Sequence, residues 1–177
     1  LVRDRGDAPE LADVRRFHAE WEKTASLHLR LGRTDVIDTY DDQGRIVGGD
    51  FEDILDAAYR SWYMDIADGK SSLLIAETNE TVTELNSRAR DDRILDGHVS
   101  PDGIRLRDGT RAGTGDIIIT RKNDRRLHTP RGWVRNGDRW TVLAVNRDQS
   151  LTVANASGWQ VRLPAGYVRD DVVLGYA

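Results

Sequence analysis

The sequence has no cysteine among its 177 residues. This absence excludes a disulfide framework, a cysteine-based zinc site and a cysteine nucleophile, and it fits a reducing compartment. Long apolar runs are missing as well, because none approaches the roughly 20 residues that a membrane-spanning helix needs. No signal-peptide pattern opens the chain either. We therefore expect a cytoplasmic protein without a membrane partner.

The sequence also lacks the spacings of common catalytic and metal sites. It contains no Gly-x-Ser-x-Gly elbow and no His-Glu-x-x-His pair, and its four histidines stand at no ligand spacing. The segment Gly69-Lys70-Ser71 has the end of a phosphate-binding loop, but Met64 stands where the first glycine is required. A helical pattern precedes this segment, whereas a phosphate-binding loop follows a strand. The 177 residues therefore predict neither a metal site nor a complete enzyme.

Charge is distributed unevenly, although the net charge is only −4. Residues 34–68 carry ten acidic and two basic side chains, whereas residues 121–139 carry seven basic and two acidic ones, a local net charge of +5. A basic segment of this kind favours binding to a polyanion. The alternative is a solvated loop, and charge alone does not decide between the two.

Helical periodicity dominates the first seventy residues. Asp50 has the side chain of a helix N-cap, and Gly69 has the freedom needed to end a helix. Apolar side chains recur at steps of three and four residues. The pattern predicts helices over residues 10–32, 35–40 and 50–69.

A strand and a helix are predicted next. Residues 73–76 are apolar on both faces, which is typical of a buried central strand in a parallel sheet. Thr81 and Glu84 have capping-box spacing for a helix that ends near Gly97. Such a unit belongs to an open α/β sheet, whose ligands bind outside the carboxyl ends of the strands.

After residue 97 the pattern changes to short strands. Alternating runs are separated by turn residues at 136–138 and 146–150. The predicted strands are residues 104–106, 116–121, 139–146, 151–155 and 160–163. Several short strands at this spacing predict a small β-barrel.

Trp133 lies among arginines within the basic segment. An exposed aromatic side chain between basic ones suits single-stranded nucleic acid, because bases stack on the ring and arginines contact the phosphates. The alternative is that Trp133 fills the barrel together with Trp140 and Trp159. We expect Trp140 to be buried, because it lies inside an apolar strand, and we leave Trp133 open.

Several blocks together resemble a known helicase family. Residues 11–17, with an arginine between apolar residues, resemble helicase motif IV, and residues 73–90 resemble the next conserved block of the second motor lobe. Residues 115–123 and 134–138 resemble the small SH3-like barrel inserted in that lobe, and residues 167–169 and 173–177 resemble the lead-in to motif V. In order and spacing the blocks are similar to RecD-like superfamily 1 helicases. The wider pattern, including Trp21-Glu22 and residues 25–27, resembles the helicase region of TraI/TrwC-type conjugative relaxases of the actinobacterial type.

This resemblance implies an α/β fold and a domain organisation. Residues 1–100 would form part of a second RecA-like (P-loop NTPase) motor lobe, and residues 101–170 an inserted SH3-like β-barrel. Residues 171–177 would return as a strand into the RecA-like lobe. Motifs I to III would precede Leu1, and motifs V and VI would follow Ala177.

The resemblance also implies a function. The parent would be an ATP-dependent DNA helicase that moves 5′ to 3′ on single-stranded DNA in conjugative transfer. ATP and Mg²⁺ would bind to the full-length parent, whereas the fragment alone would be inactive because Walker A and B motifs are absent. Its partners would be single-stranded DNA and the remainder of the helicase/relaxase chain. The alternative is a stand-alone SH3-like module that binds nucleic acid or a protein.

The resemblance assigns roles to particular residues. Arg16 would be catalytic and would contact the γ-phosphate of ATP, with Arg15 as the alternative if the register differs by one residue. The competing interpretation of Arg16 is an ion pair on a helix surface. The DNA-binding residues would be Thr78, Asn79, Arg121, Asn123, Arg125, Arg126 and Trp133.

Overall fold

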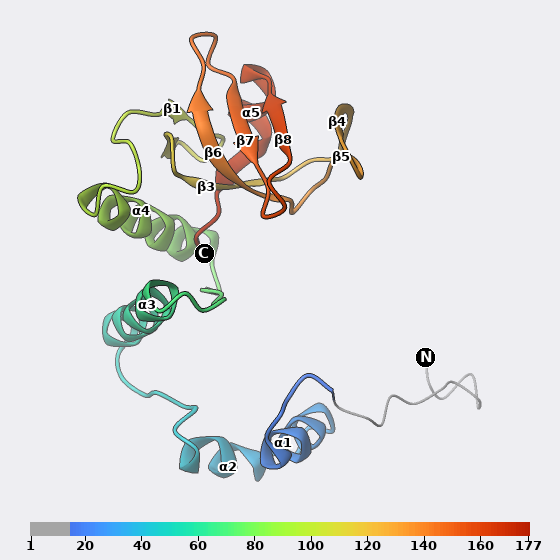
Figure 1. Ribbon diagram of the computed structural model, residues 1–177. Helices are drawn as coiled ribbons and strands as arrows, with labels where there is room; N and C mark the ends of the chain where they lie inside the picture. Colours follow the sequence, from blue (N-terminus) through green and yellow to red (C-terminus); the bar gives the residue numbers. More distant parts are fainter. Residues whose placement is uncertain (1–14) are drawn as a thin grey trace, which may run out of the picture. The chain divides into compact units, whose positions relative to one another are not determined.

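A computed structural model of the chain describes residues 15–177. The chain divides into two compact units, unit 1 up to Asp56 and unit 2 from Ala57 onward. In chain order the helices are α1 (Glu20–Arg30), α2 (Val36–Asp42), α3 (Phe51–Ala67), α4 (Asn79–Leu95) and α5 (Ala165–Asp171) (Figure 1). None of the helices within residues 15–177 is long and apolar enough to cross a membrane.

The strands all follow residue 103 within the described part of the chain. They are β1 (Ile104–Arg105), β2 (Arg111–Ala112), β3 (Ile117–Thr120), β4 (Asp124–Thr129), β5 (Gly132–Val134), β6 (Arg139–Val145), β7 (Leu151–Ala154), β8 (Gln160–Leu163) and β9 (Val172–Leu174). Together with the helices they form a mixed α/β structure. The predicted mixture of helices and strands is therefore confirmed.

Unit 1 contains α1 and α2, which pack against each other. Trp21 of α1 meets Tyr40 of α2 edge to face, with the ring centroids 5.7 Å apart. The helix predicted over residues 10–32 is shorter in the structure, because α1 begins only at Glu20 and residues 15–19 are not helical. The backbone of Ala19 is extended there, which sets the first turn at Glu20. The predicted residues before Arg15 lie outside the described part.

The ends of α3 confirm the sequence prediction. The Asp50 side-chain Oδ1 accepts the backbone N–H of Asp53 at 3.0 Å, so Asp50 caps the first turn. The helix ends at Ala67, and Gly69 follows with a φ of +74°. A backbone with this φ favours glycine, because a side chain would meet the backbone.

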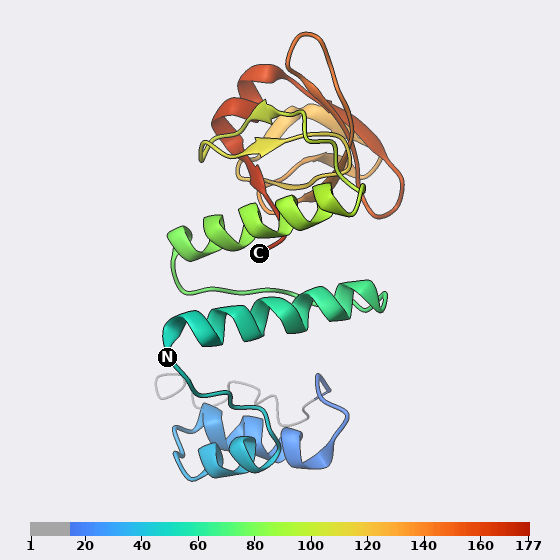
Figure 2. The same cartoon turned by 90° about the vertical axis from the view of Figure 1, so that its left-hand side faces the viewer.

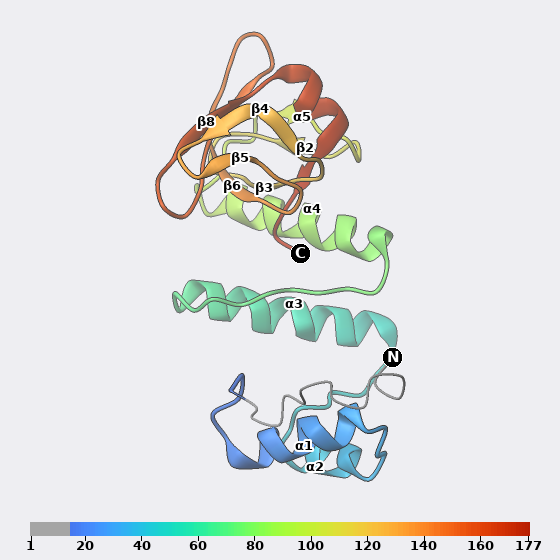
Figure 3. The ribbon, with the colours of Figure 1, turned by 90° about the vertical axis from the view of Figure 1, so that its right-hand side faces the viewer.

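The buried parallel strand predicted at residues 73–76 is wrong. Residues 70–78 contain no strand. Leu73 and Ile75 are 76% and 83% exposed, and only Leu74 is buried. A strand needs a neighbour that pairs its backbone groups, and the described strands all pair elsewhere. Figures 2 and 3 show this segment running back between α3 and α4.

Helix α4 begins earlier than its predicted capping box. Thr78 is the N-cap, and its Oγ1 accepts the backbone N–H of Thr81 at 3.1 Å. The cap therefore lies three residues before the predicted one at Thr81. The predicted end is confirmed, because the helix stops at Leu95 and Gly97 has a φ of +74°.

The β part of unit 2 contains an open sheet in which the strands are antiparallel. The strand order is β8-β7-β6-β3-β9, and β1-β2 and β4-β5 form separate two-stranded sheets. Alternate residues of β3 and β6 are buried, as expected for a sheet with one face on the core. The five predicted strands are confirmed as β1, β3, β6, β7 and β8. A closed barrel is not observed in the described residues, because β8 and β9 are edges of the open sheet.

The last strand belongs to this sheet. β9, within the segment expected to return into a RecA-like lobe, pairs antiparallel with β3, with Val173 opposite Ile119. The short helix α5 precedes it and lies against β9. Periodicity alone does not predict β2, β9, α5 or the β4–β5 hairpin.

Candidate nucleic-acid interface

The basic segment folds into a hairpin and a turn. Strands β4 and β5 pair antiparallel, with His128 opposite Trp133, and a register shift interrupts the pairing further along. β4 also lies near β8 at the edge of the main sheet (Figure 3). Much of the basic segment is therefore strand rather than loop. Pairing the two strands satisfies backbone groups and leaves the arginine side chains exposed.

Two guanidinium groups lie close to the ring of Trp133 on β5. The Arg125 guanidinium carbon is 5.2 Å from the centroid of the Trp133 ring, and that of Arg135 is 5.5 Å away. These distances fit cation–π contacts. Trp133 is half-buried and both arginines are exposed. We call these three residues the Trp133 stack.

Arg126 is engaged with a carboxylate of its own strand. Its Nη2 and Nε donate to the two carboxylate oxygens of Asp124 at 2.7 and 3.0 Å. These hydrogen bonds, helped by the backbone N–H of Arg126, lower the pKa of Asp124 to about 2. Part of the Arg126 charge is therefore balanced inside the hairpin.

The turn between β5 and β6 is held by internal hydrogen bonds. Asp138 Oδ2 accepts the backbone N–H of Arg135 at 2.7 Å, and the buried Thr120 hydroxyl donates to the Arg135 carbonyl at 2.6 Å. Asn123 Oδ1 accepts the backbone N–H of Asn136 at 3.0 Å. These bonds fix the backbone that carries Arg135 beside Trp133.

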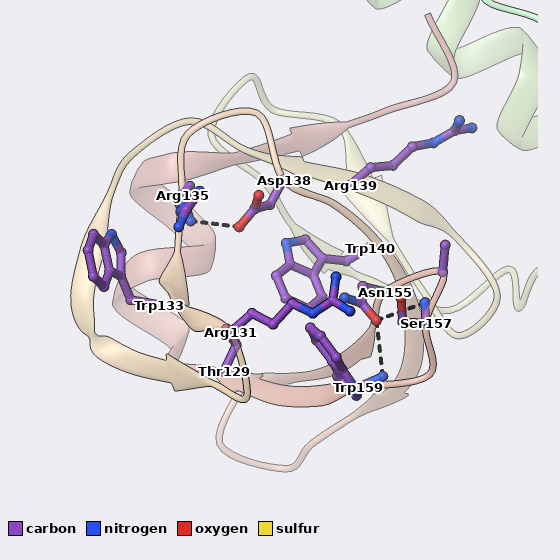
Figure 4. A pocket seen from close by; sticks show the side chains of 11 residues that line it. Thr129, Arg131, Trp133, Arg135, Asp138, Arg139, Trp140, Asn155, Ser157 and Trp159 are labelled. Carbon is purple, nitrogen blue, oxygen red and sulfur yellow. Dashed lines mark hydrogen bonds between the residues drawn. The ribbon is translucent and has the colours of Figure 1, made fainter.

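A pocket of about 450 Å³ opens beside the hairpin (Figure 4). We call it the Trp159 pocket. It lies between β4–β5, the start of β6 and the turn between β7 and β8. Its lining residues are Thr129, Arg131, Trp133, Arg135, Asp138, Arg139, Trp140, Asn155, Ala156, Ser157 and Trp159.

Three tryptophans give the pocket its apolar surface. Trp140 is 3% exposed and forms the inner wall, which confirms the prediction that it is buried. Its Nε1 is buried without a hydrogen-bond partner among the described residues. Trp159 is half-buried, and the Arg131 guanidinium lies 4.8 Å from its ring centroid. Figure 4 shows Arg131 reaching across the pocket toward Trp159.

Of the predicted DNA-binding residues, the structure brings Arg125 and Trp133 into contact. Arg121 is exposed just after β3, and its backbone N–H donates to the Asp171 carbonyl at 2.7 Å. Thr78 and Asn79 lie at the beginning of α4 and not on the hairpin. They are exposed, and Thr78 also serves as the helix cap.

The predicted phosphate-contacting arginines lie in unit 1. Arg15 and Arg16 are both exposed, and Arg16 is in a bend before α1 rather than on a helix. Arg16 is therefore not on a helix, so the alternative of an ion pair on a helix surface does not apply to it. Among residues 15–177 there is no group of three or more histidines or acids that could hold a metal ion.

Sequence patterns do not identify the residues that complete the pocket. They single out Arg131 only as a neighbour of Trp133, and Trp159 only as a candidate core residue. Asn155 and Ser157 carry no predicted role at all. The sequence Asn155-Ala-Ser-Gly-Trp159 contains the signal that could have indicated this part of the pocket. Asn and Gly are typical turn residues, and the tryptophan follows them directly.

One comparison with known proteins gives a match. Residues 1–50 match the profile of a family described as an AAA domain. The match indicates helicase-like, P-loop NTPase character for this part of the chain. No curated protein matches the sequence. The matched residues belong to unit 1, so unit 2 is interpreted from its structure.

Proposed function

We propose that this chain is part of an ATP-dependent DNA helicase and that the β4–β5 hairpin of unit 2 binds single-stranded DNA. The observation that carries the proposal is the Trp133 stack, in which two exposed arginines lie close to one aromatic ring. A tryptophan ring can stack with any base, and arginines beside it contact the backbone phosphates. This combination suits a surface that follows a single strand without reading its sequence.

The balance of charges supports the same surface. Arg125, Arg131 and Arg135 are exposed on or next to the hairpin, and in the part of the chain that the structure describes none of them has a carboxylate partner like that of Arg126. Phosphates can therefore approach these three guanidinium groups. We expect Arg126 to contribute less to binding, because its Nε and Nη2 already donate to Asp124.

The helicase part of the proposal rests on unit 1 and on the segment before α4. The AAA match over residues 1–50 supports an NTPase parent. Arg16 is exposed, as an arginine that contacts the γ-phosphate of ATP must be. The exposed Leu73 and Ile75 leave an apolar surface before α4 that the described residues do not cover, which supports contact with the remainder of a motor lobe. In that setting Thr78 and Asn79 would face the DNA.

The finer assignment follows the resemblance of the sequence blocks. We infer movement 5′ to 3′ on single-stranded DNA in conjugative transfer. The parent would be a RecD-like helicase joined to a TraI/TrwC-type relaxase in the cytoplasm. ATP and Mg²⁺ would bind to the full-length parent, and the strands of unit 2 would be the SH3-like insertion.

Charge reversal on the hairpin tests the DNA-binding part. We expect Arg125→Glu to weaken binding of a labelled single strand, measured by fluorescence anisotropy, by at least about tenfold at low salt, because it replaces a phosphate contact by repulsion. Arg126→Glu should weaken it less. Arg147→Glu, in the turn between β6 and β7, removes the same charge at a position outside the pocket and is the matched control. Unchanged affinity of Arg125→Glu would contradict the assignment of this surface.

A test of the helicase part of the proposal requires the full-length parent protein. We expect Arg16→Ala to lower its ATPase rate by about 10³-fold while DNA binding stays nearly the same. The competing function is a stand-alone binding module, which the separate core of unit 2 favours. A full-length protein without DNA-stimulated ATPase activity would support that alternative.

A further inference from the structure

The Trp159 pocket combines aromatic surface with hydrogen-bond donors. The lining arginines can only donate, and they outnumber the one lining carboxylate, Asp138, whose Oδ2 already accepts the backbone N–H of Arg135. A ligand that fits must therefore carry acceptors, and a flat ring would cover the exposed part of Trp159. A volume of about 450 Å³ is within the range of small-molecule sites.

The turn between β7 and β8 holds Trp159 in place. Asn155 Oδ1 accepts the backbone N–H groups of Ser157 and Trp159, each at 3.0 Å. The backbone N–H of Asn155 in turn donates to the Trp159 carbonyl at 3.0 Å. Gly158 supplies the φ of +81° that this tight turn requires. The backbone that carries the ring is thus fixed before any ligand arrives, which reduces the entropy lost on binding.

The same hydrogen bonds orient the Asn155 amide. Since Oδ1 faces the turn, Nδ2 points the other way, and Figure 4 shows it on the side of Trp140 and Arg131. Within residues 15–177 no hydrogen bond is found for this NH₂ group. An asparagine NH₂ can donate to the carbonyl oxygens or ring nitrogens of a base.

We propose that the Trp159 pocket binds one nucleotide of the single strand. The base stacks on Trp159 in the place now taken by the Arg131 guanidinium, and Asn155 Nδ2 donates to an acceptor on the base edge. Arg131, exposed at the tip of the hairpin, turns to the neighbouring phosphate. This inference rests on the proposed function, because it assigns a position along the strand that the hairpin binds.

The pocket favours a nucleotide within a strand over a free one. Trp133 and Arg135 line the pocket and also belong to the Trp133 stack. The two tryptophans therefore offer two platforms, one in the pocket and one on the hairpin. Two bases of one strand can occupy both, which a free mononucleotide cannot do.

The test compares strands with and without bases. We expect the chain to bind a labelled thymidine strand of about 12 nucleotides at least about tenfold more tightly than an abasic strand of equal length. Trp159→Ala should weaken binding of the thymidine strand by about tenfold to a hundredfold. The same substitution should leave affinity for the abasic strand within about twofold. Trp159→Phe keeps an aromatic ring and should restore most of the loss.

A second variant controls for the possibility that Trp159→Ala weakens binding by unfolding the protein. Ser157→Phe adds bulk at the pocket without removing a contact of Trp159, because the hydrogen bond from residue 157 comes from its backbone. We expect it to weaken thymidine-strand binding like Trp159→Ala, with an unchanged melting temperature. Equal affinity of wild type, Trp159→Ala and Ser157→Phe for the thymidine strand would overturn the pocket assignment and leave the hairpin proposal intact.

Two other outcomes distinguish the pocket assignment from the proposed function and from a site for free nucleotides. If wild type binds neither strand, the proposed function fails and the pocket assignment fails with it. If thymidine monophosphate quenches tryptophan fluorescence at the same concentrations as the strand, the pocket is a free-nucleotide site and the assignment to a strand is wrong. We expect the mononucleotide to bind at least about a hundredfold more weakly, because it lacks the neighbouring platform and phosphates.

Discussion

The Arg90 guanidinium of α4 donates from Nε to Asp116 Oδ2 at 2.9 Å inside unit 2, where the Asp116 side chain is completely buried. The other Asp116 oxygen accepts the Tyr176 hydroxyl at 2.7 Å, and the backbone N–H of Gly113 also donates to Oδ2. Arg90 Nη2 reaches the carbonyl of Ser100 at 3.0 Å. The pair thus joins α4, the start of β3 and the chain end, and it positions the sheet that carries the hairpin.

Removing one partner of this pair should destabilise unit 2. Arg90→Met leaves the Asp116 carboxylate buried without its cation, so we expect a loss of about 3–5 kcal/mol in the free energy of unfolding. Urea denaturation followed by circular dichroism measures it. Arg169→Met, which removes the exposed pair with Asp170, is the control and should cost far less, because water screens this pair. A loss for Arg90→Met as small as that of the control would show that the pair does not hold the unit together.

Two glycines with similar backbone angles should respond differently to alanine. Gly115 has a φ of +91°, and a Cβ there would lie 2.1 Å from the His98 carbonyl oxygen. We expect Gly115→Ala to cost about 3–5 kcal/mol, because the clash adds to the backbone strain. Gly137 has a φ of +88° with open space around it, so Gly137→Ala should cost only about 1–2 kcal/mol. Thermal melts of both variants give the comparison, and equal losses would contradict the close packing at Gly115.

The contact between α3 and α4 includes two tyrosine hydroxyls. Tyr59 is 2% exposed and donates to Asp92 Oδ2 at 2.6 Å, whereas Tyr63 donates to Asp96 at a more exposed position. We expect Tyr59→Phe to lower the free energy of unfolding by about 1–3 kcal/mol, because a carboxylate loses its donor. Tyr63→Phe should cost less than about 1 kcal/mol, because water can replace the lost donor there. Chemical denaturation of the two variants tests this, and a larger loss at Tyr63 would be inconsistent with it.

The Asp124–Arg126 pair should appear in a pH titration. Asp124 has a pKa of about 2 because Arg126 donates to it, so the pair contributes stability above about pH 4. That contribution is lost as the pH falls through about 2, since a depressed folded pKa favours the ionised form. Carboxyl NMR shifts should show Asp124 titrating near pH 2 in wild type. Arg126→Ala should move the midpoint up toward the usual value of an aspartate, and an unmoved midpoint would show that Arg126 does not cause the low pKa.

The elements that periodicity predicts best are those held by local contacts. Helix α3 matches its prediction because Asp50 and Gly69 act within a few residues of the helix ends. The turn at Asn136–Asp138 is likewise read from its own residues. By contrast, β9 depends on pairing with β3, which lies more than fifty residues earlier in the chain. No local pattern reveals such a partner.

The candidate site also has a part that local sequence predicts and a part that depends on distant contacts. Trp133 among arginines is visible in the sequence, and the structure places the guanidinium groups of Arg125 and Arg135 close to its ring. The pocket was not predictable, because Trp159 and Arg131 meet only through the contact of β4 with β8. The prediction of a buried strand at residues 73–76 failed for a related reason. Apolar composition fits a buried strand, but burial requires a partner that the described residues do not supply.

The salt dependence of single-strand binding tests the central claim most directly. The claim is that exposed arginines of the Trp133 stack contact phosphates, and each such contact contributes about 0.7 to the slope of log K against log salt concentration. We predict that Arg125→Ala combined with Arg135→Ala lowers the magnitude of this slope by about 1.4 and weakens binding at low salt. An unchanged slope with unchanged affinity, in a variant that melts like wild type, would contradict the claim that this hairpin binds nucleic acid.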